Sequence, residues 1–299
     1  MMKKNMWSRW ILALAVVWPF MAAARDRVRE KENFDFDWKF ILNADDRAND
    51  GMQVSEAGWQ DVQLPHDWSI SLNFDPKLSG SNGHLPGGIG WYRKTFRVDK
   101  KDKGRRIAVL FDGIYSRSDV YVNGQHLGFR PYGFCYQEYD LTPYLNYGAE
   151  NVLAVRVNNP LEHDSVARWY TGAGIYRHAW LVKTAEVHVA SYGTYVTTPV
   201  VTAERAEVRV RASVANEAER TKTLSVRQQI TDGEGRTVVQ SGKQALQVAA
   251  GQTADTEHTL EIPRPQLWNT EHPYLYTLHT TVYDGRKPVS YTHLRAHET

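Results

Sequence analysis

The sequence lacks several features on which common protein classes depend. Its single cysteine, Cys135, excludes an intramolecular disulfide, and we expect this side chain to be a small buried apolar group. The 299 residues carry 36 lysines and arginines against 34 aspartates and glutamates. Three of the cations stand within residues 1–24, so the remaining chain is close to neutral. This balance predicts no attraction to nucleic acid or to an anionic membrane surface.

A long apolar run is also missing. The run at residues 10–20 is well short of the roughly 20 residues that a membrane-spanning helix needs. It follows three cations and precedes three alanines at residues 22–24, an order typical of a secretory signal peptide cleaved before Arg25. We therefore expect residues 1–24 to be removed, and the mature protein to be periplasmic or secreted without a membrane attachment.

After this leader, no apolar stripe with a period of 3.6 residues persists over three turns. Short β-branched and aromatic runs separated by turn signals replace it, which predicts an all-β protein. Residues 34–40 alternate apolar and polar side chains as a half-buried strand does. Residues 151–157 are apolar on both faces, as in a central strand, and Asn123-Gly124 is a strong hairpin signal. About eight such strands predict a jelly roll of two sheets over residues 25–185.

The pattern changes near residue 185. Aromatic residues become rarer, and residues 207–214 alternate strictly between polar and apolar side chains. Comparable short runs follow at regular spacing, separated by turns such as residues 232–235. This pattern predicts an immunoglobulin-like β-sandwich, without its disulfide, over residues 186–289.

Residues 290–299 lack apolar alternation. We interpret them as translated vector or adapter sequence and expect a non-native or disordered tail. His293 and His297 in this tail are spaced like a helical metal pair, but no third ligand accompanies them. We therefore predict neither a metal nor another cofactor.

The most distinctive stretch is residues 168–177, in which three aromatics and two arginines surround Gly172 and Gly174. Flat aromatic rings and guanidinium groups suit the apolar faces and hydroxyl rims of a sugar. A glycine-rich turn clamped by aromatic packing is the alternative that explains the same composition. A second candidate is the polar loop at residues 71–90, whose length is typical of functional or disordered segments.

An ordered set of segments resembles glycoside hydrolase family 2. The segments are residues 64–68, 85–96, 111–115, 122–124, 130–133, 139–143, 151–158, 168–177, 265–268 and 273–276. Each segment alone is weak evidence, but their shared order over residues 34–287 is specific. The resemblance implies a jelly roll, then an immunoglobulin-like domain, then a catalytic (β/α)₈ barrel.

Residues 85–92 are most similar to periplasmic β-galactosidases of this family, although the same domains also precede β-glucuronidase and β-mannosidase barrels. The resemblance therefore implies an exo-acting retaining β-glycosidase that hydrolyses terminal β-galactosides. The family places both catalytic carboxyl groups on the barrel. We expect this chain to be a fragment that is inactive alone, with the C-terminal barrel and a carbohydrate as its partners. Self-association through the exposed barrel-facing surface is also expected.

The resemblance places Arg168 and Trp169 where family members touch the non-reducing sugar. Asp75, Asn82 and His84 are the polar candidates in the loop at residues 71–90, and solvation of that loop is their alternative role. Asn216-Glu217 is similar to the dipeptide of the family's acid/base, but it stands on a polar turn of the second domain. Asp67 is interpreted as a cap or turn former.

Two other classes of function are compatible with the sequence. A self-sufficient carbohydrate-binding module or lectin would need a complete site on the jelly roll alone. An adhesin-like array of β-sandwiches would leave the composition of residues 168–177 unexplained.

Overall fold

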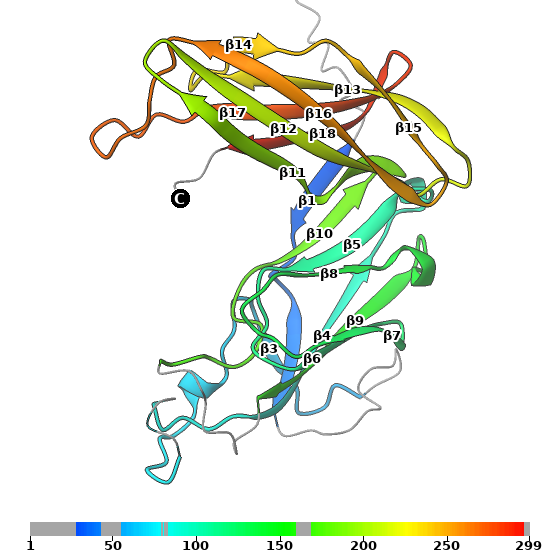
Figure 1. Cartoon of the computed structure of the whole chain (residues 1–299). Coiled ribbons are helices and arrows are strands. Elements are labelled where there is room, and N and C mark those ends of the chain that lie inside the picture. Colours follow the sequence, from blue (N-terminus) through cyan, green and yellow to red (C-terminus); the bar gives the residue numbers. More distant parts are fainter. Residues whose placement is uncertain (1–27, 43–54, 79, 81–82, 160–168, 296–299) are drawn as a thin grey trace, which may run out of the picture.

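The computed structural model describes residues 28–42, 55–78, 80, 83–159 and 169–295, which form two β-sandwich domains one after the other (Figure 1). The first domain pairs a six-stranded sheet, in the order β3-β2-β4-β9-β6-β7, with a four-stranded sheet, β1-β10-β5-β8. Its strands are β1 (Arg29–Asn33), β2 (Trp38–Leu42), β3 (Gln60–Val62), β4 (Gly88–Arg97), β5 (Arg106–Phe111), β6 (Ser118–Val122), β7 (Gln125–Arg130), β8 (Gln137–Asp140), β9 (Glu150–Asn159) and β10 (Ala179–Thr184). Short 3-10 turns occupy Ser69–Ser71, Lys100–Asp102 and Thr142–Tyr144.

The second domain pairs a sheet ordered β11-β12-β16 with one ordered β14-β13-β17-β18, in which β15 also pairs with β13. Its strands are β11 (Val187–Val201), β12 (Arg205–Asn216), β13 (Lys222–Thr231), β14 (Thr237–Gln240), β15 (Gln244–Val248), β16 (Gln252–Pro263), β17 (Thr277–Asp284) and β18 (Lys287–Arg295). All strand pairs in both domains are antiparallel. The all-β prediction is therefore confirmed.

Several strands lie where the pattern predicts them. β9 lies between β4 and β6, and its residues 151–155 are buried on both faces. Asn123-Gly124 forms the turn between β6 and β7. Every second residue of β12, from Ala206 to Val214, is buried against β13 and β17, as the alternation predicts.

Residues 34–40 do not form the single strand predicted from their alternation. Residues 34–37 make a turn, with Asp37 at φ 58°, and β2 begins only at Trp38. The carboxylate of Asp35 explains the difference, because it accepts hydrogen bonds from the Ala179 amide at 2.8 Å and from His178 Nδ1 at 2.7 Å. Trp38 Nε1 closes the same turn on the Phe34 carbonyl at 2.7 Å. The alternation of polar and apolar residues here does not come from a strand. It comes from the buried side chain of Asp35, which lies in the turn between the core residues Phe34 and Trp38.

The expected disorder of the tail is wrong for residues 290–295. They belong to β18, which pairs with β17 along its length, and the side chain of Ser290 is buried and accepts a hydrogen bond from the Val189 amide at 3.1 Å. A strand ladder uses backbone groups, so an available edge such as β17 can order a segment without apolar alternation. The non-native origin of these residues stays a prediction.

The two domains meet through a cluster of charges. Arg106 contacts Glu138 of its own domain at 2.8 Å and Glu217 of the second domain at 3.0 Å. His188 Nε2 lies 3.7 Å from the same Glu217 carboxylate and is 4% exposed. Glu217, the candidate noted for its Asn-Glu context, thus lies in a contact between domains. The preceding Asn216 is fully buried and donates to the Val248 carbonyl.

This cluster makes the stability of the chain sensitive to acid. Burial, followed by the neighbouring Arg106, lowers the pKa of His188 to about 4. Between pH 6.5 and 4 the unfolded chain binds a proton at this imidazole and the folded chain does not, so stability falls as the pH falls. The loss from His188 alone is about 3 kcal/mol. Burial raises the pKa of Glu217 and so works in the opposite direction.

Thermal unfolding followed by circular dichroism at pH 7 and pH 4.5 checks this expectation. His188→Gln should lose less of its melting temperature on acidification than the unchanged chain. His272→Gln removes an exposed imidazole and should follow the unchanged chain. Parallel losses in all three proteins would contradict the prediction.

Candidate functional site

The glycine-rich stretch is fixed to the jelly roll by backbone hydrogen bonds. The amides of His66 and Trp68 donate to the carbonyls of Ile175 (2.9 Å) and Ala173 (3.2 Å). Gly174 forms a reciprocal bridge with Tyr115, with bonds of 2.9 and 2.8 Å. These partners are distant in sequence, so the loop is a rigid edge of the sandwich.

Gly174 is required at its position for two reasons. Its φ is 111°, a conformation that other residues rarely adopt. A Cβ at this position would lie 2.2 Å from Tyr92 Oη and 2.8 Å from the His66 carbonyl oxygen. The glycine therefore allows the loop to lie directly against the core.

The carboxylate of Asp67 joins its own segment to the glycine-rich loop, because it accepts hydrogen bonds from both. Its Oδ1 accepts hydrogen bonds from the amides of Ser69 and Ala173, each at 3.0 Å, and its Oδ2 accepts one from Tyr170 Oη at 2.6 Å. Burial, together with this carboxylate, raises the pKa of Tyr170. The phenol therefore stays protonated and donates to Asp67. The interpretation of Asp67 as a turn former is correct for Ser69 but omits its longer contacts.

His66 and Tyr92 support the loop from beneath. His66 Nδ1 lies 2.8 Å from Tyr92 Oη. Burial lowers the pKa of His66 and raises that of Tyr92. Both side chains are therefore neutral near pH 7, so this pair orients the loop without adding charge.

Five aromatic rings gather at the loop, three of them exposed, and we call them the aromatic cluster. Its members are Tyr115, Tyr132, Phe134, Trp169 and Tyr176. Phe134 is central, with ring centroids at 5.1 Å from Tyr115, 5.8 Å from Tyr132, and 6.4 Å from both Trp169 and Tyr176. Trp169 is 60% exposed and Tyr132 61%. Exposed rings held on a rigid edge can stack on the apolar face of a sugar.

The structure places the predicted site residues in different surroundings, and two of them lie outside its described part. Trp169 belongs to the aromatic cluster, whereas Arg168 and Asn82 lie outside the described residues. Asp75 and His84 are exposed and hold their own loop: Asp75 Oδ1 accepts from the Lys77 amide at 2.9 Å, and His84 Nδ1 lies 2.8 Å from the Leu78 carbonyl oxygen. The Asp75 amide also donates to the His84 carbonyl at 2.9 Å. The structure thus joins these two residues to each other.

Sequence reasoning did not include Phe134, and it singled out Tyr170 only as an aromatic of the stretch at residues 168–177, without its bond to Asp67. Phe134 directly follows the segment at residues 130–133 that carries the resemblance, and this proximity was the available signal. Cys135 is half-buried rather than buried, because it lies in this loop with its Sγ 3.6 Å from the Tyr132 carbonyl oxygen.

The residues that the structure describes lack both a metal-ligand cluster and a membrane-spanning helix. They contain no group of three or more histidine, cysteine, aspartate or glutamate side chains arranged to hold a metal ion. They also contain no helix that is long and apolar enough to span a membrane.

A jelly roll with exposed aromatic rings on the loop at residues 169–177, which we call the loop edge, is an architecture that carbohydrate-binding β-sandwiches also use. The sequence profile described as "Glycosyl hydrolases family 2, sugar binding domain" matches residues 32–185, and that described as "Glycosyl hydrolases family 2" matches residues 187–294. The chain belongs to glycosyl hydrolases family 2. The resemblance of its ordered segments is thereby confirmed.

Named relatives include two different activities. The chain is 43% identical over 262 residues to Beta-galactosidase BoGH2A of Bacteroides ovatus, covering 85% of this chain and 30% of that protein. It is 32% identical over 288 residues to a Beta-glucuronidase of Formosa agariphila, covering 87% of this chain and 28% of that protein. The chain therefore spans about 30% of the length of these relatives.

Solved structures match the fold. A glycosyl hydrolase family 2 member from Bacteroides cellulosilyticus superimposes with a TM-score of 0.80 at 37% identity, covering 89% of this chain and 36% of that chain. A beta-glucuronidase from glycoside hydrolase family 2 gives a TM-score of 0.82 at 30% identity, covering 89% and 30%. These matches support a jelly roll followed by an immunoglobulin-like domain.

Proposed function

We propose that this chain is the sugar-binding and immunoglobulin-like part of an exo-acting retaining β-galactosidase. The observation that carries the proposal is the 43% identity to a Beta-galactosidase over 262 residues. A catalytic barrel in the whole protein supplies the acid/base and the nucleophile, whose carboxyl groups stand about 5–5.5 Å apart in retaining enzymes. Residues 1–24 export the protein, and N-terminal sequencing of the exported protein should begin at Arg25.

In this assembly, the loop edge contributes to the pocket for the terminal sugar. Trp169 and the aromatic cluster stack on the apolar face of the sugar, and Arg168 bonds its hydroxyl groups. Asp67 and Gly174 act as positioning residues, since they fix the loop that carries Trp169. Asp75 and His84 are weaker candidates because their polar atoms already bond within their own loop.

The purified chain is expected to release no nitrophenol from nitrophenyl β-galactoside, because both catalytic carboxyl groups belong to the barrel. The assay uses protein expressed in a host without its own β-galactosidase. A preparation of the Trp169→Ala variant reports the contaminating background. Turnover above that background in the unchanged chain would contradict the proposal.

The second candidate is a self-sufficient lectin, favoured by the exposed and braced aromatic cluster. Calorimetry with galactose, lactose and galactan separates the two functions: a lectin would bind more tightly than about 1 mM, and half of an enzyme pocket would not. If the lectin binds, Trp169→Ala should weaken binding about tenfold. Trp268→Ala, at a 44% exposed tryptophan of the second domain, is the matched control and should have no effect.

The sugar itself is the finer part of the proposal. A β-glucuronidase parent is supported by the Formosa agariphila relative, and a β-mannosidase parent by the wider family resemblance. Activity of the whole protein on nitrophenyl β-galactoside, β-glucuronide and β-mannoside distinguishes the three. A preference for either of the last two would overturn the galactoside assignment.

A further inference from the structure

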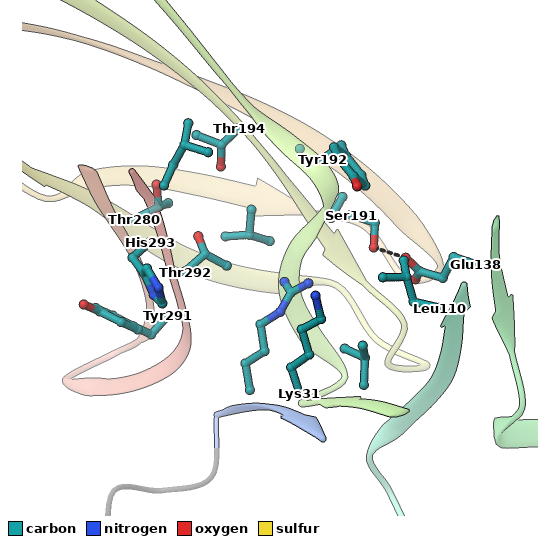
Figure 2. Close-up of a pocket in the computed structure, with 16 residues that line it drawn as sticks. Lys31, Leu110, Glu138, Ser191, Tyr192, Thr194, Thr280, Tyr291, Thr292 and His293 are labelled. Atoms are coloured by element: carbon teal, nitrogen blue, oxygen red, sulfur yellow. Dashed lines mark hydrogen bonds between the residues drawn. The ribbon is translucent and has the colours of Figure 1, made fainter. Parts of the chain in front are cut away.

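A pocket lies at the junction of the two domains, formed by residues that the proposed sugar site does not use. Its volume is about 660 Å³, within the range of small-molecule sites. Its floor is the outer face of the sheet β1-β10-β5-β8, and its walls are β11 and β17. Residues 291–294 of β18, interpreted above as non-native, also line it, and their side chains carry none of the argument. Figure 2 shows Lys31 projecting from β1 towards the part of β11 that carries Tyr192 and Thr194.

The pocket exists because β11 leaves its regular pairing there. The register of β11 with β12 shifts between Val189 and Thr194. Tyr192 lies within this irregularity at φ 53° and is 71% exposed. Its ring stacks on Tyr136 of the first domain, with centroids 4.2 Å apart. An open aromatic face therefore stands at the rim of the pocket.

Two basic side chains, Arg29 and Lys31, line the pocket beside one acid, Glu138, which is also paired with Arg106. Arg29 and Lys31 stand two residues apart on β1, so both side chains point to the same face of the sheet. Within the described part of the chain, neither forms an ion pair, although Lys31 Nζ lies 3.9 Å from the centre of the Trp180 ring.

The acid that lines the pocket, Glu138, already has partners for both of its carboxylate oxygens. Glu138 Oε1 pairs with Arg106 at 2.8 Å, and Glu138 Oε2 accepts a hydrogen bond from Ser191 Oγ. Desolvation lowers the pKa of Arg29, the attraction of Glu138 acts against this, and the repulsion of Arg106 lowers the pKa further. An anion bound near Arg29 would add to the attraction of Glu138 and offset the repulsion of Arg106.

The remaining lining suits a sugar rather than a bare ion. Hydroxyl groups come from Thr194 and Thr280, and apolar surface comes from Leu110 and Val182. Hydroxyls both donate and accept hydrogen bonds, as sugar hydroxyls require.

We propose that this pocket binds an acidic saccharide, with its carboxylate or sulfate group between Arg29 and Lys31 and its ring against Tyr192. The site is separate from the loop edge at residues 169–177 and does not depend on the activity proposed for the whole protein. It would hold a charged glycan while the family's catalytic site cleaves a terminal bond.

Calorimetry of the full chain with digalacturonate, galactose 6-sulfate and lactose tests this proposal. Digalacturonate or galactose 6-sulfate should bind at least about tenfold more tightly than lactose, and binding should weaken several-fold between about 20 and 200 mM salt. The two acidic ligands show whether a carboxylate or a sulfate is preferred. Failure of both to bind, or equal affinity for inorganic sulfate, would overturn the assignment.

The variants identify the site. The double variant Arg29→Ala/Lys31→Ala should weaken binding of the acidic ligand about tenfold or more. Arg97→Ala/Lys103→Ala removes the same charge from exposed positions outside the pocket and should change it little. Equal losses in the two double variants would refute a site at β1. Circular dichroism verifies that each variant is folded.

One further variant distinguishes binding in this pocket from binding at the loop edge. Trp169→Ala should leave binding of the acidic ligand unchanged, because Trp169 does not line the pocket. A loss of acidic-ligand binding in Trp169→Ala would instead assign that ligand to the loop edge.

Discussion

Replacing Gly174 by alanine is expected to lower the free energy of unfolding of the first domain by about 4 kcal/mol. Two costs combine in this value. The first is backbone strain, because φ is 111°. The second is the clash of the added Cβ with Tyr92 Oη and the His66 carbonyl oxygen, at 2.2 and 2.8 Å. Tyr92 is fully buried between core aromatics and cannot move away cheaply.

Gly235→Ala is the matched control for this experiment. Gly235 has φ 81°, but no atom lies within 4 Å of the position of an added Cβ. The control therefore isolates backbone strain, which costs about 1 kcal/mol. Urea unfolding followed by tryptophan fluorescence gives both values. Losses of equal size would show that the close approach of the loop to Tyr92 contributes nothing.

Asp67→Ala is expected to destabilise the first domain by about 3 kcal/mol, because one carboxylate loses three hydrogen bonds at once. Asp67→Asn keeps an oxygen for the amides of Ser69 and Ala173 and loses the negative charge that accepts from Tyr170. It should therefore lose only about 1 kcal/mol. Asp75→Ala removes one exposed bond to the Lys77 amide and should lose less than about 1 kcal/mol.

Chemical denaturation gives these free energies, and amide hydrogen exchange locates the change. In Asp67→Ala, exchange should accelerate at the Ala173 amide and its neighbours, while the strands of the second domain stay protected. A similar loss in Asp67→Ala and Asp75→Ala would contradict the view that Asp67 holds the two segments together. Unchanged exchange at Ala173 would do the same.

The sequence by itself determined the fold class and much of its layout. Alternation in β12 indicates its buried face, because side chains of a strand point to opposite sides. Asn123-Gly124 indicates its hairpin for an equally local reason, since both residues favour positive φ and the structure gives 50° and 81°. The ordered segments indicate family 2, and the same resemblance places Trp169 among the candidate residues, a role that stays a prediction.

Only the tertiary structure decided features that depend on partners distant in the chain. Asp67 and Ala173 are 106 residues apart, and a short Asp-containing segment does not reveal that its carboxylate holds a second loop. The same holds for the turn at Asp35. Its carboxylate accepts a hydrogen bond from the Ala179 amide, and residues 34–40 are therefore not the single strand that their alternation predicts. Residues 290–295 belong to β18 because β17 offers backbone donors and acceptors, which no side-chain pattern in those residues predicts. Local periodicity reports which face of a segment is buried, whereas hydrogen-bond partners are set by which segments the fold brings together.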